Sequence, residues 1–410
     1  MINSVAPHVW PYAPLGDHFV ITSSKRVFQK DWRSRGVPFY RARELAVLGR
    51  KGWVNNELFI DREMYERFQR SYGAPSAGDF LITGVGTLGK TYVVKDGDEF
   101  YFKDGNIIWL KRSSSVESNF LNQLYKTPFI IDQIFGNSAG STVGTYTITN
   151  AKKTIIPLPH PVEQRAIARA LDDTDKLIES LENLITKKMA IKKGIEQQLL
   201  TGRIRLPGFT KQWQNVVLGD VAQFSKGNGL PKSALSPSGS KACIHYGELF
   251  TSYGPEIFDI TSRTTSSAQS VYSEDLDVLM PTSDVTPRGL AKASAIHSRG
   301  VILGGDILII RAEKSLAYGP FIAHTIRLDE NQVLKLVRGS TVYHLYASDM
   351  GKFEMFLPDV IEQKAIAKVI SDTSQEIETL QVRLSKTIGI KTGMMQQLLT
   401  GRIRINEGAK

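Results

Sequence analysis

Residues 163–168, Glu-Gln-Arg-Ala-Ile-Ala, and residues 362–367, Glu-Gln-Lys-Ala-Ile-Ala, are near copies of one another. The likeness continues without a gap, at an offset of 199 positions, to 197–205 and 396–404, which both read Gln-Gln-Leu-Leu-Thr-Gly-Arg-Ile-Arg. The first copy shares 23 identities in 43 aligned positions with the second. A repeat of this strength indicates that the chain consists of two similar halves.

The two repeated segments are predicted to be long α-helices. Their apolar residues alternate at intervals of four and three positions, which places the side chains along one helix stripe. Pro161 and Pro358 precede the stripes, and Gly202 and Gly401 follow them, where a C-terminal cap is expected. The stripe expected to pair the helices or bind a partner comprises Ile167, Leu171, Ile178, Leu181, Ile185, Ile195 and Leu199 in the first copy, and Ile366, Ile370, Ile377, Leu380, Leu384, Met394 and Leu398 in the second.

A helix of about 40 residues is about 60 Å long, and its apolar stripe needs a partner helix. Two like elements in one chain tend to pair about a pseudo-two-fold axis. We therefore expect the two helices to pair in opposite directions as a coiled coil. A coiled coil with a purely structural role remains the alternative.

A shorter repeat opens each half of the chain. Trp10 is separated by four residues from Leu15-Gly16-Asp17, as Trp213 is from Leu218-Gly219-Asp220. The chain is therefore predicted to comprise a variable domain, a helix, a second variable domain and a second helix, at 1–155, 156–209, 210–355 and 356–410.

The variable domains are predicted to be α+β. Short β-rich runs alternate with Gly, Ser, Asn and Asp turns, although the strand order does not follow from the sequence. The two domains resemble each other faintly. Glu44-Leu45, after Tyr40, resembles Glu248-Leu249, after Tyr246, and Gly78-Asp79 resembles either Gly305-Asp306 or Leu276-Asp277. The expected strands are 80–83, 91–94, 106–110, 301–303 and 306–310, with a short helix at 120–125.

The composition favours an acidic partner such as nucleic acid. The net charge is +10, and residues 1–155 hold 20 basic and 14 acidic side chains, whereas 210–355 hold 14 of each. Cys243 is the single cysteine, so an internal disulfide is excluded. No apolar run is long enough for a membrane span and no secretion signal opens the sequence, so a reducing cytoplasm is expected.

Two motifs imitate catalytic sites. Residues 84–91, Gly-Val-Gly-Thr-Leu-Gly-Lys-Thr, match the phosphate-binding loop of ATPases. That mechanism needs a helix at Lys90, yet a β-rich run follows, so a hairpin loop is the favoured interpretation. Pro358-Asp359 before Glu362-Gln363-Lys364 imitates a nuclease motif, but the spacing is too short and fits the start of a helix.

No active site is expected in this chain. It contains no Pro-Pro pair, so the Asn-Pro-Pro-aromatic site of DNA amino-methyltransferases is absent. The seven histidines show no metal-ligand spacing with cysteine or carboxylates.

The repeated helix motifs and the Trp-x4-Leu-Gly-Asp openings resemble those of type I DNA specificity subunits. The resemblance covers the whole chain. It implies two α+β target-recognition domains, at 1–155 and 210–355, separated by two long antiparallel coiled-coil helices with a pseudo-two-fold repeat. It also implies a non-catalytic subunit of a restriction-modification complex, in which each domain recognises one half of a bipartite, asymmetric target in double-stranded DNA.

The same resemblance implies partners and cofactors. The helices would set the gap between the half-sites and dock two modification subunits, which methylate adenine with S-adenosylmethionine. Restriction subunits would join for ATP- and Mg-dependent cleavage in phage defence, and no cofactor is expected in this chain. One alternative is a specificity module for another effector, such as a fused methyltransferase-nuclease or a phage-defence complex, and another is a scaffold without a DNA role.

Basic residues in polar loops are the candidate DNA contacts, because Lys and Arg supply affinity for phosphates. For each of them a merely solvated side chain is the alternative. The candidates are Lys25, Arg26, Lys30, Arg33, Arg35, Arg41, Arg43 and Lys90 in the first domain, and Lys226, Lys232, Arg263, Arg288, Arg311 and Lys314 in the second.

Overall fold

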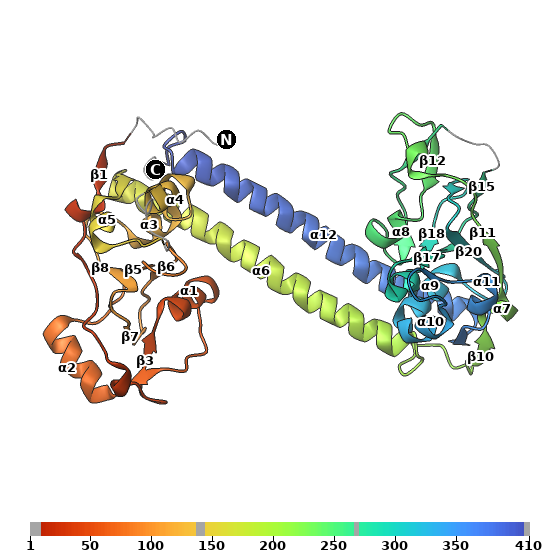
Figure 1. Cartoon of the computed structure of the whole chain (residues 1–410), viewed down its shortest axis with the longest axis horizontal. Coiled ribbons are helices and arrows are strands. Elements are labelled where there is room, and N and C mark those ends of the chain that lie inside the picture. Colours follow the sequence, from red (N-terminus) through yellow and green to blue (C-terminus); the bar gives the residue numbers. More distant parts are fainter. Residues whose placement is uncertain (1–9, 137–143, 266–269, 406–410) are drawn as a thin grey trace. The chain divides into compact units, whose positions relative to one another are not determined.

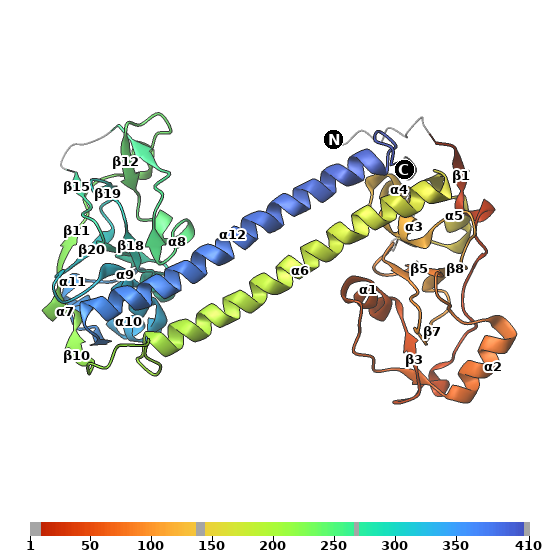
Figure 2. The same ribbon diagram turned by 180° about the vertical axis from the view of Figure 1, so that it is seen from behind.

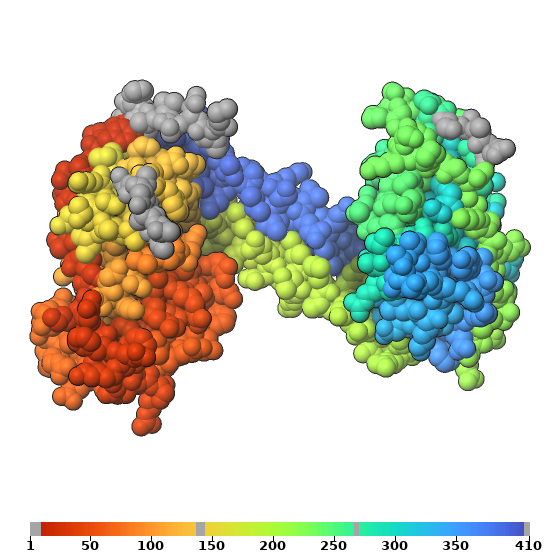
Figure 3. All heavy atoms as spheres, in the orientation of Figure 1, coloured from red at the N-terminus to blue at the C-terminus, as the bar shows by residue number. Residues whose placement is uncertain are grey.

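The computed structural model describes residues 10–136, 144–265 and 270–405, and in it the chain divides into two units. The first unit consists of residues 1–181 with 383–410, and the second of 182–382. Both long helices, α6 (Pro161–Leu199) and α12 (Val360–Leu398), contribute one part to each unit. Each unit therefore holds one α+β domain together with a stretch of two paired helices (Figure 3).

The helices α6 and α12 run in opposite directions within each unit (Figures 1 and 2). In the first unit the hydroxyl of Thr174 lies 3.7 Å from the Met394 sulfur, and farther toward the start of α6, Glu163 pairs with Arg404. In the second unit Lys188 pairs with Glu376 at 2.7 Å. The expected antiparallel pair of helices is confirmed.

Most residues of the apolar stripes pack against other parts of the same chain. Ile167, Leu171, Met394 and Leu398 pack in the core of the first unit. Ile195, Leu199, Ile366 and Ile370 pack in that of the second. Of the remaining stripe residues, Leu181, Ile185 and Ile377 are buried, whereas Ile178, Leu380 and Leu384 are half-buried.

The first domain contains a four-stranded antiparallel sheet, order β2-β8-β5-β6, and a three-stranded sheet, order β4-β3-β7, in which β3 and β7 are parallel. The described strands are β1 (Tyr12–Pro14), β2 (Ile21–Thr22), β3 (Val37–Tyr40), β4 (Phe59–Ile60), β5 (Phe80–Thr83), β6 (Thr91–Val93), β7 (Tyr101–Phe102), β8 (Ile107–Leu110) and β9 (Ile155–Pro157). The helices are η1 (Leu15–Asp17), η2 (Gln29–Asp31), α1 (Ala42–Lys51), α2 (Arg62–Tyr72), α3 (Ser118–Leu124), α4 (Pro128–Gly136) and α5 (Ile148–Lys153).

The second domain contains a five-stranded sheet, order β11-β20-β16-β18-β13, and a four-stranded sheet, order β14-β12-β19-β15. The described strands are β10 (Gln214–Val217), β11 (Ala222–Lys226), β12 (Lys241–Ile244), β13 (Glu256–Ile257), β14 (Arg263–Thr264), β15 (Val271–Tyr272), β16 (Val278–Pro281), β17 (Ser283–Asp284), β18 (Ser294–Ile296), β19 (Ile302–Leu303), β20 (Ile307–Ala312), β21 (Tyr343–His344) and β22 (Glu354–Leu357). The helices are α7 (Leu218–Val221), α8 (Glu248–Thr251), η3 (Lys232–Ala234), η4 (Pro287–Ala291), α9 (Gly319–Leu328), α10 (Glu330–Leu336) and α11 (Ala347–Met350).

The two domains share one topology, because the order β2-β8-β5-β6 matches β11-β20-β16-β18. Asp79 precedes β5 and Asp277 precedes β16, and each carboxylate accepts a backbone N–H three residues earlier, at 3.0 and 2.8 Å. Of the two predicted counterparts of Gly78-Asp79, the structural one is therefore Leu276-Asp277. Gly305-Asp306 precedes β20 instead.

The short repeat at the start of each half closes its domain. β1 pairs with β9, and the amide of Leu15 donates to the Thr154 carbonyl at 2.8 Å. In the second domain β10 pairs with β22, and the Leu218 amide donates to the Phe353 carbonyl at 2.8 Å. Each opening segment thus binds the segment that precedes a long helix.

None of the helices in the described part of the chain has an apolar stretch of the length that a membrane span requires.

Candidate nucleic-acid interface

Residues 84–90 form the loop of a β-hairpin, as predicted. The loop joins β5 to β6, which pair antiparallel, and Lys90 is followed by a strand. The hydroxyl of Thr83 accepts a hydrogen bond from the Lys90 amide at 2.9 Å and donates one to the Thr87 carbonyl. Gly86 and Gly89 have φ angles of +79° and +70°, which favour glycine. The hydrogen bonds of Thr83 therefore fix the backbone of the loop that carries the exposed Lys90.

The basic residues between β2 and β3 lie on exposed loops. Lys25 Nζ lies 4.9 Å from the centre of the Tyr72 ring, and Arg26 Nε lies 2.8 Å from Asp104 Oδ2. Arg33 pairs with Asp61 at 2.9 Å. Lys30 and Arg35 are exposed as well. All five cations are therefore exposed on the segment between β2 and β3.

Arg41 and Arg43 flank the start of α1 and share the carboxylate of Glu44. Arg41 donates from Nε and Nη2 at 3.0 and 2.8 Å, and from its backbone amide at 3.1 Å. Burial raises the pKa of Glu44, but the hydrogen bonds and charge of Arg41 outweigh burial and hold this pKa below its ordinary value. Arg41 is therefore fixed in place, whereas the Arg43 side chain is 73 % exposed.

A hollow of about 510 Å³ lies in the second domain where three segments meet. It is lined by Lys226 with residues 227–231, by His245 and Tyr246, and by Gly305 with Asp306. Lys226 Nζ lies 3.3 Å from Asp306 Oδ1, and both side chains are about half exposed, at 59 % and 47 %. The exposed Lys232 follows in η3.

The other basic candidates of the second domain do not share one environment. Arg311 forms a two-pronged bond with the buried Asp277, at 2.8 Å for both contacts, and pairs with Glu274. Those carboxylates raise the pKa of Arg311, hydrogen bonding by Asp277 being the largest cause. The remaining three are exposed: Arg263 donates to the Ser240 carbonyl at 3.4 Å, Arg288 pairs with Glu330 at 3.0 Å, and Lys314 lies in a turn.

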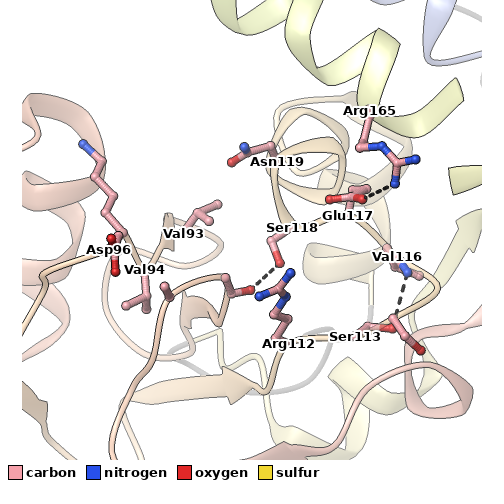
Figure 4. Close-up of a pocket in the computed structure, with 14 residues that line it drawn as sticks. Val93, Val94, Asp96, Arg112, Ser113, Val116, Glu117, Ser118, Asn119 and Arg165 are labelled. Atoms are coloured by element: carbon pink, nitrogen blue, oxygen red, sulfur yellow. Dashed lines mark hydrogen bonds and ion pairs between the residues drawn. The ribbon is translucent and has the colours of Figure 1, made fainter. Parts of the chain in front are cut away.

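A second hollow, of about 940 Å³, lies beside the start of α6 in the first unit (Figure 4). Lys95, Arg112 and Arg165 line it, and Arg165 Nη1 donates to Glu117 Oε1 at 2.8 Å. These cations were not among the predicted DNA contacts. The available signal was the third position of the repeated opening motif, which is basic in both copies, as Arg165 and Lys364.

Lys364 lines a smaller hollow of about 100 Å³ at the matching place in the second unit. Arg311 and Asp277 also line it. Arg311 thus binds Asp277 here, whereas in the first domain the equivalent carboxylate of Asp79 accepts a hydrogen bond from the Trp109 indole at 2.8 Å. The two units thus carry the same basic position beside unlike surroundings.

The segment that imitates a nuclease motif is the start of α12, as predicted. Asp359 Oδ1 accepts hydrogen bonds from the amides of Ile361 and Glu362, at 3.1 and 3.0 Å, and so caps the helix. The carboxylate of Glu362 is fully buried and binds Arg205 through two contacts of 2.6 Å. Both carboxylates therefore have structural partners.

A protein-family model described as the type I restriction modification DNA specificity domain matches this chain twice, at residues 7–189 and 210–388. The chain is 31 % identical over 185 residues to S.HindORF215P, a type I restriction enzyme specificity subunit of Haemophilus influenzae. That alignment spans 45 % of this chain and less than half, 43 %, of the relative. The MjaX specificity subunit of Methanocaldococcus jannaschii is 25 % identical over 347 residues, which cover 80 % of this chain and 79 % of the relative.

The fold is similar to that of a solved structure, the S subunit of a type I restriction-modification system from M. genitalium. The TM-score is 0.61 at 15 % identity, and the alignment covers 97 % of both chains. At this identity the comparison concerns the fold alone.

Proposed function

The chain belongs to the type I restriction modification DNA specificity family, and from this membership we propose that its two domains recognise the two halves of one bipartite DNA target. It is the non-catalytic, DNA-specificity subunit of such a system. The observation that carries the proposal is the pair of domains with a common order of four strands but different sequences. Two such readers in one chain favour an asymmetric target rather than a palindrome.

Binding would combine cations for phosphates with polar side chains for bases. The exposed cations of the first domain, Lys30, Arg35, Arg43 and Lys90, are suited to the first task. The paired helices α6 and α12, which both contribute to each unit, would fix the unread gap between the half-sites.

The partners are proposed to be two modification subunits, and restriction subunits for cleavage. S-adenosylmethionine, ATP and Mg would be held by those subunits, in the cytoplasm where the DNA is. The stripe residues of α6 and α12 contact the chain itself, so a docked subunit would need other helix residues. Ile191 and Ile390, which are equivalent in the repeat, are 43 % and 61 % exposed and are suited to this role.

The test is DNA binding by the complex assembled with its modification subunits. Reversing the charge of Arg33 and Arg35 to Glu should weaken binding and lower the slope of affinity against salt by roughly two, one for each lost phosphate contact. The matched control reverses Arg67 and Arg70, two exposed arginines of α2. An unchanged slope for the first pair would remove those arginines from the interface, and the absence of any sequence preference in the unaltered complex would contradict the proposed function.

A further inference from the structure

Three segments that are far apart in the sequence meet at an equivalent place in each domain. In the first domain the Gly105 amide donates to Ser23 Oγ at 3.3 Å, and the Lys103 amide donates to the Tyr40 carbonyl at 2.8 Å. One follows the edge strand β2 or β11, one follows β3 or β12, and one precedes β8 or β20. In the second domain they enclose the hollow of about 510 Å³ described above. The three segments are 23–28, Arg41 and 104–106 in the first domain, and 226–231, His245 and 305–306 in the second.

Backbone hydrogen bonds show that Asn106 and Asp306 occupy equivalent positions. The Asn106 carbonyl accepts from the amide of Gly84, which follows β5, at 2.8 Å, and the Asp306 carbonyl accepts from the amide of Thr282, which follows β16, at 2.9 Å. The next residue begins β8 or β20 in the same register with its neighbour. The two side chains therefore extend from one backbone site.

Arg41 and His245 are equivalent in the same way. Each directly follows a strand that pairs in parallel with its neighbour, β3 with β7 and β12 with β19. Each donates its amide to a glutamate three residues later, Arg41 to Glu44 at 3.1 Å and His245 to Glu248 at 2.8 Å. The domains thus hold a guanidinium and an imidazole on matching scaffolds.

The side chains at this site differ between the domains in hydrogen-bonding chemistry. Asn106 carries an amide, which both donates and accepts, where Asp306 carries a carboxylate, which accepts only. The segment after the edge strand contains Lys25 and Arg26 in the first domain but Asn228 and Gly229 in the second. One backbone with unlike polar groups is what two readers of different sequences require.

We propose that this three-segment site is where each domain contacts the base edges of its half-site, and that the residues at positions 106 and 41, and 306 and 245, select the bases. The inference rests on the proposed function and names the residues that carry it. In the major groove an amide suits adenine, a carboxylate suits the amino group of cytosine, and arginine suits guanine.

The groups are placed for such contacts. Lys226 and Asp306 are about half exposed and lie 3.3 Å apart, so Lys226 can exchange this contact for a phosphate while the carboxylate turns to a base. Arg41 is held by Glu44 through two side-chain bonds, which keep its guanidinium in one orientation. His245 and Tyr246 also line the hollow, with ring centres 4.7 Å apart and ring planes inclined at 45° to each other.

The experiment measures the DNA sequence preference of the complex with its modification subunits, on a library of randomised double-stranded DNA. Asp306→Asn, which installs the residue of the first domain, should change the preferred base at one position of a single half-site. We expect the original base to lose at least about tenfold in preference, with the other half-site unchanged. His245→Gln is a second, independent variant with the same expected confinement to one half-site.

The matched control is Asp259→Asn, the same change at an exposed aspartate outside the three segments, and it should leave the preference unaltered. An unchanged target and affinity for both Asp306→Asn and His245→Gln would overturn the inference. Equally weakened binding to all DNA sequences would also overturn it, because that result would mean that the residues contact phosphates rather than bases. If the unaltered complex prefers a bipartite target, the proposed function stands, and either of these outcomes contradicts only the present inference.

Discussion

Arg404, at the end of the second repeat, binds Glu163, at the start of the first, through two contacts of 2.5 and 2.7 Å. The converse pair, Arg205 with Glu362, has the same two-pronged geometry. Each arginine also lies against a tryptophan from the opening motif, Trp10 at 5.7 Å and Trp213 at 5.5 Å from the ring centre. The three repeated motifs therefore meet at one junction in each unit.

Removing the arginine of one junction should destabilise its unit, because Glu163 is buried and would be left without a cationic partner. Arg404→Ala should lower the midpoint of thermal unfolding of the chain by a few degrees or more, whereas Arg402→Ala, at an exposed neighbour, should leave it nearly unchanged. Scanning calorimetry of the three proteins measures the effect. Equal midpoints for both variants would show that the ion pair contributes nothing.

The exposed isoleucines of the helices predict how many partners bind. Ile191 lies in the second unit and Ile390 in the first. Replacing either isoleucine by arginine should weaken the binding of one modification subunit by about tenfold or more. Replacing both should prevent assembly of the complex. Native mass spectrometry should then count one subunit for each single variant. Val285→Arg, at a 72 % exposed residue off the helices, is the control, and two subunits bound to the double variant would exclude this surface.

Cys243 should be inert in the folded protein. It is fully buried, and burial together with the charge of Glu248 raises the pKa of its thiol to about 11. Because the thiolate is the reactive form, labelling with iodoacetamide at pH 8 should be slower by at least about a hundredfold than in denaturant. The rate should rise with denaturant in parallel with the loss of tertiary structure. Rapid labelling of the native chain would place Cys243 in an open environment.

Glu256 predicts a loss of stability in acid. Burial raises its pKa, but hydrogen bonds from His297 and His324 and their charge lower it to about 2. A carboxyl whose pKa is lowered by folding stabilises the folded state at pH values above its ordinary pKa of 4.5. This stabilisation is lost as the pH falls from 4.5 toward 2. Urea unfolding from pH 6 to pH 3 should show a steeper fall for the unaltered chain than for Glu256→Gln, by on the order of 2 kcal/mol over the full window.

The matched control for this titration is Glu354→Gln, at an exposed glutamate of β22, which should reproduce the unaltered curve. Parallel curves for the unaltered chain and Glu256→Gln would show that the histidine contacts carry no net stability. The amide variant should also be less stable at pH 6, because the hydrogen-bonded histidines lose their anionic partner.

The helices could be predicted because their signal is local. An apolar stripe at helical spacing depends on residues three or four positions apart, so Ile167 and Leu171 already indicate one face. The antiparallel pairing followed from the repeat itself. The hairpin at 84–90 was equally local, because a strand after Lys90 excludes the phosphate-binding loop.

The sheets could not be predicted, because their pairing is not local. Phe39 lies beside Tyr101 in a parallel pair, and no period in the sequence marks that contact. The same limit explains why Gly305-Asp306 and Leu276-Asp277 looked equally good as counterparts of Gly78-Asp79. Register with neighbouring strands separates them, and a single sequence contains no register.

The basic residues show a similar limit at the level of side chains. Arg311 and Arg35 were equivalent as sequence candidates, yet Arg311 is bound to the buried Asp277 and Arg35 is exposed. The partner of Arg404 lies 241 positions away. Charge in a sequence therefore indicates the kind of ligand, whereas the division between internal ion pairs and open cations depends on the fold.

The division of the chain into two units limits the order in which they can fold during synthesis on the ribosome. Residues 182–382 form one unit without a break, whereas the other unit needs both 1–181 and 383–410. The unit 182–382 has all its residues once residue 382 has been made, whereas the unit that contains the earlier residues 1–181 also requires residues 383–410. The two-pronged bond between Arg404 and Glu163 therefore forms only after all of residues 182–382 have been synthesised.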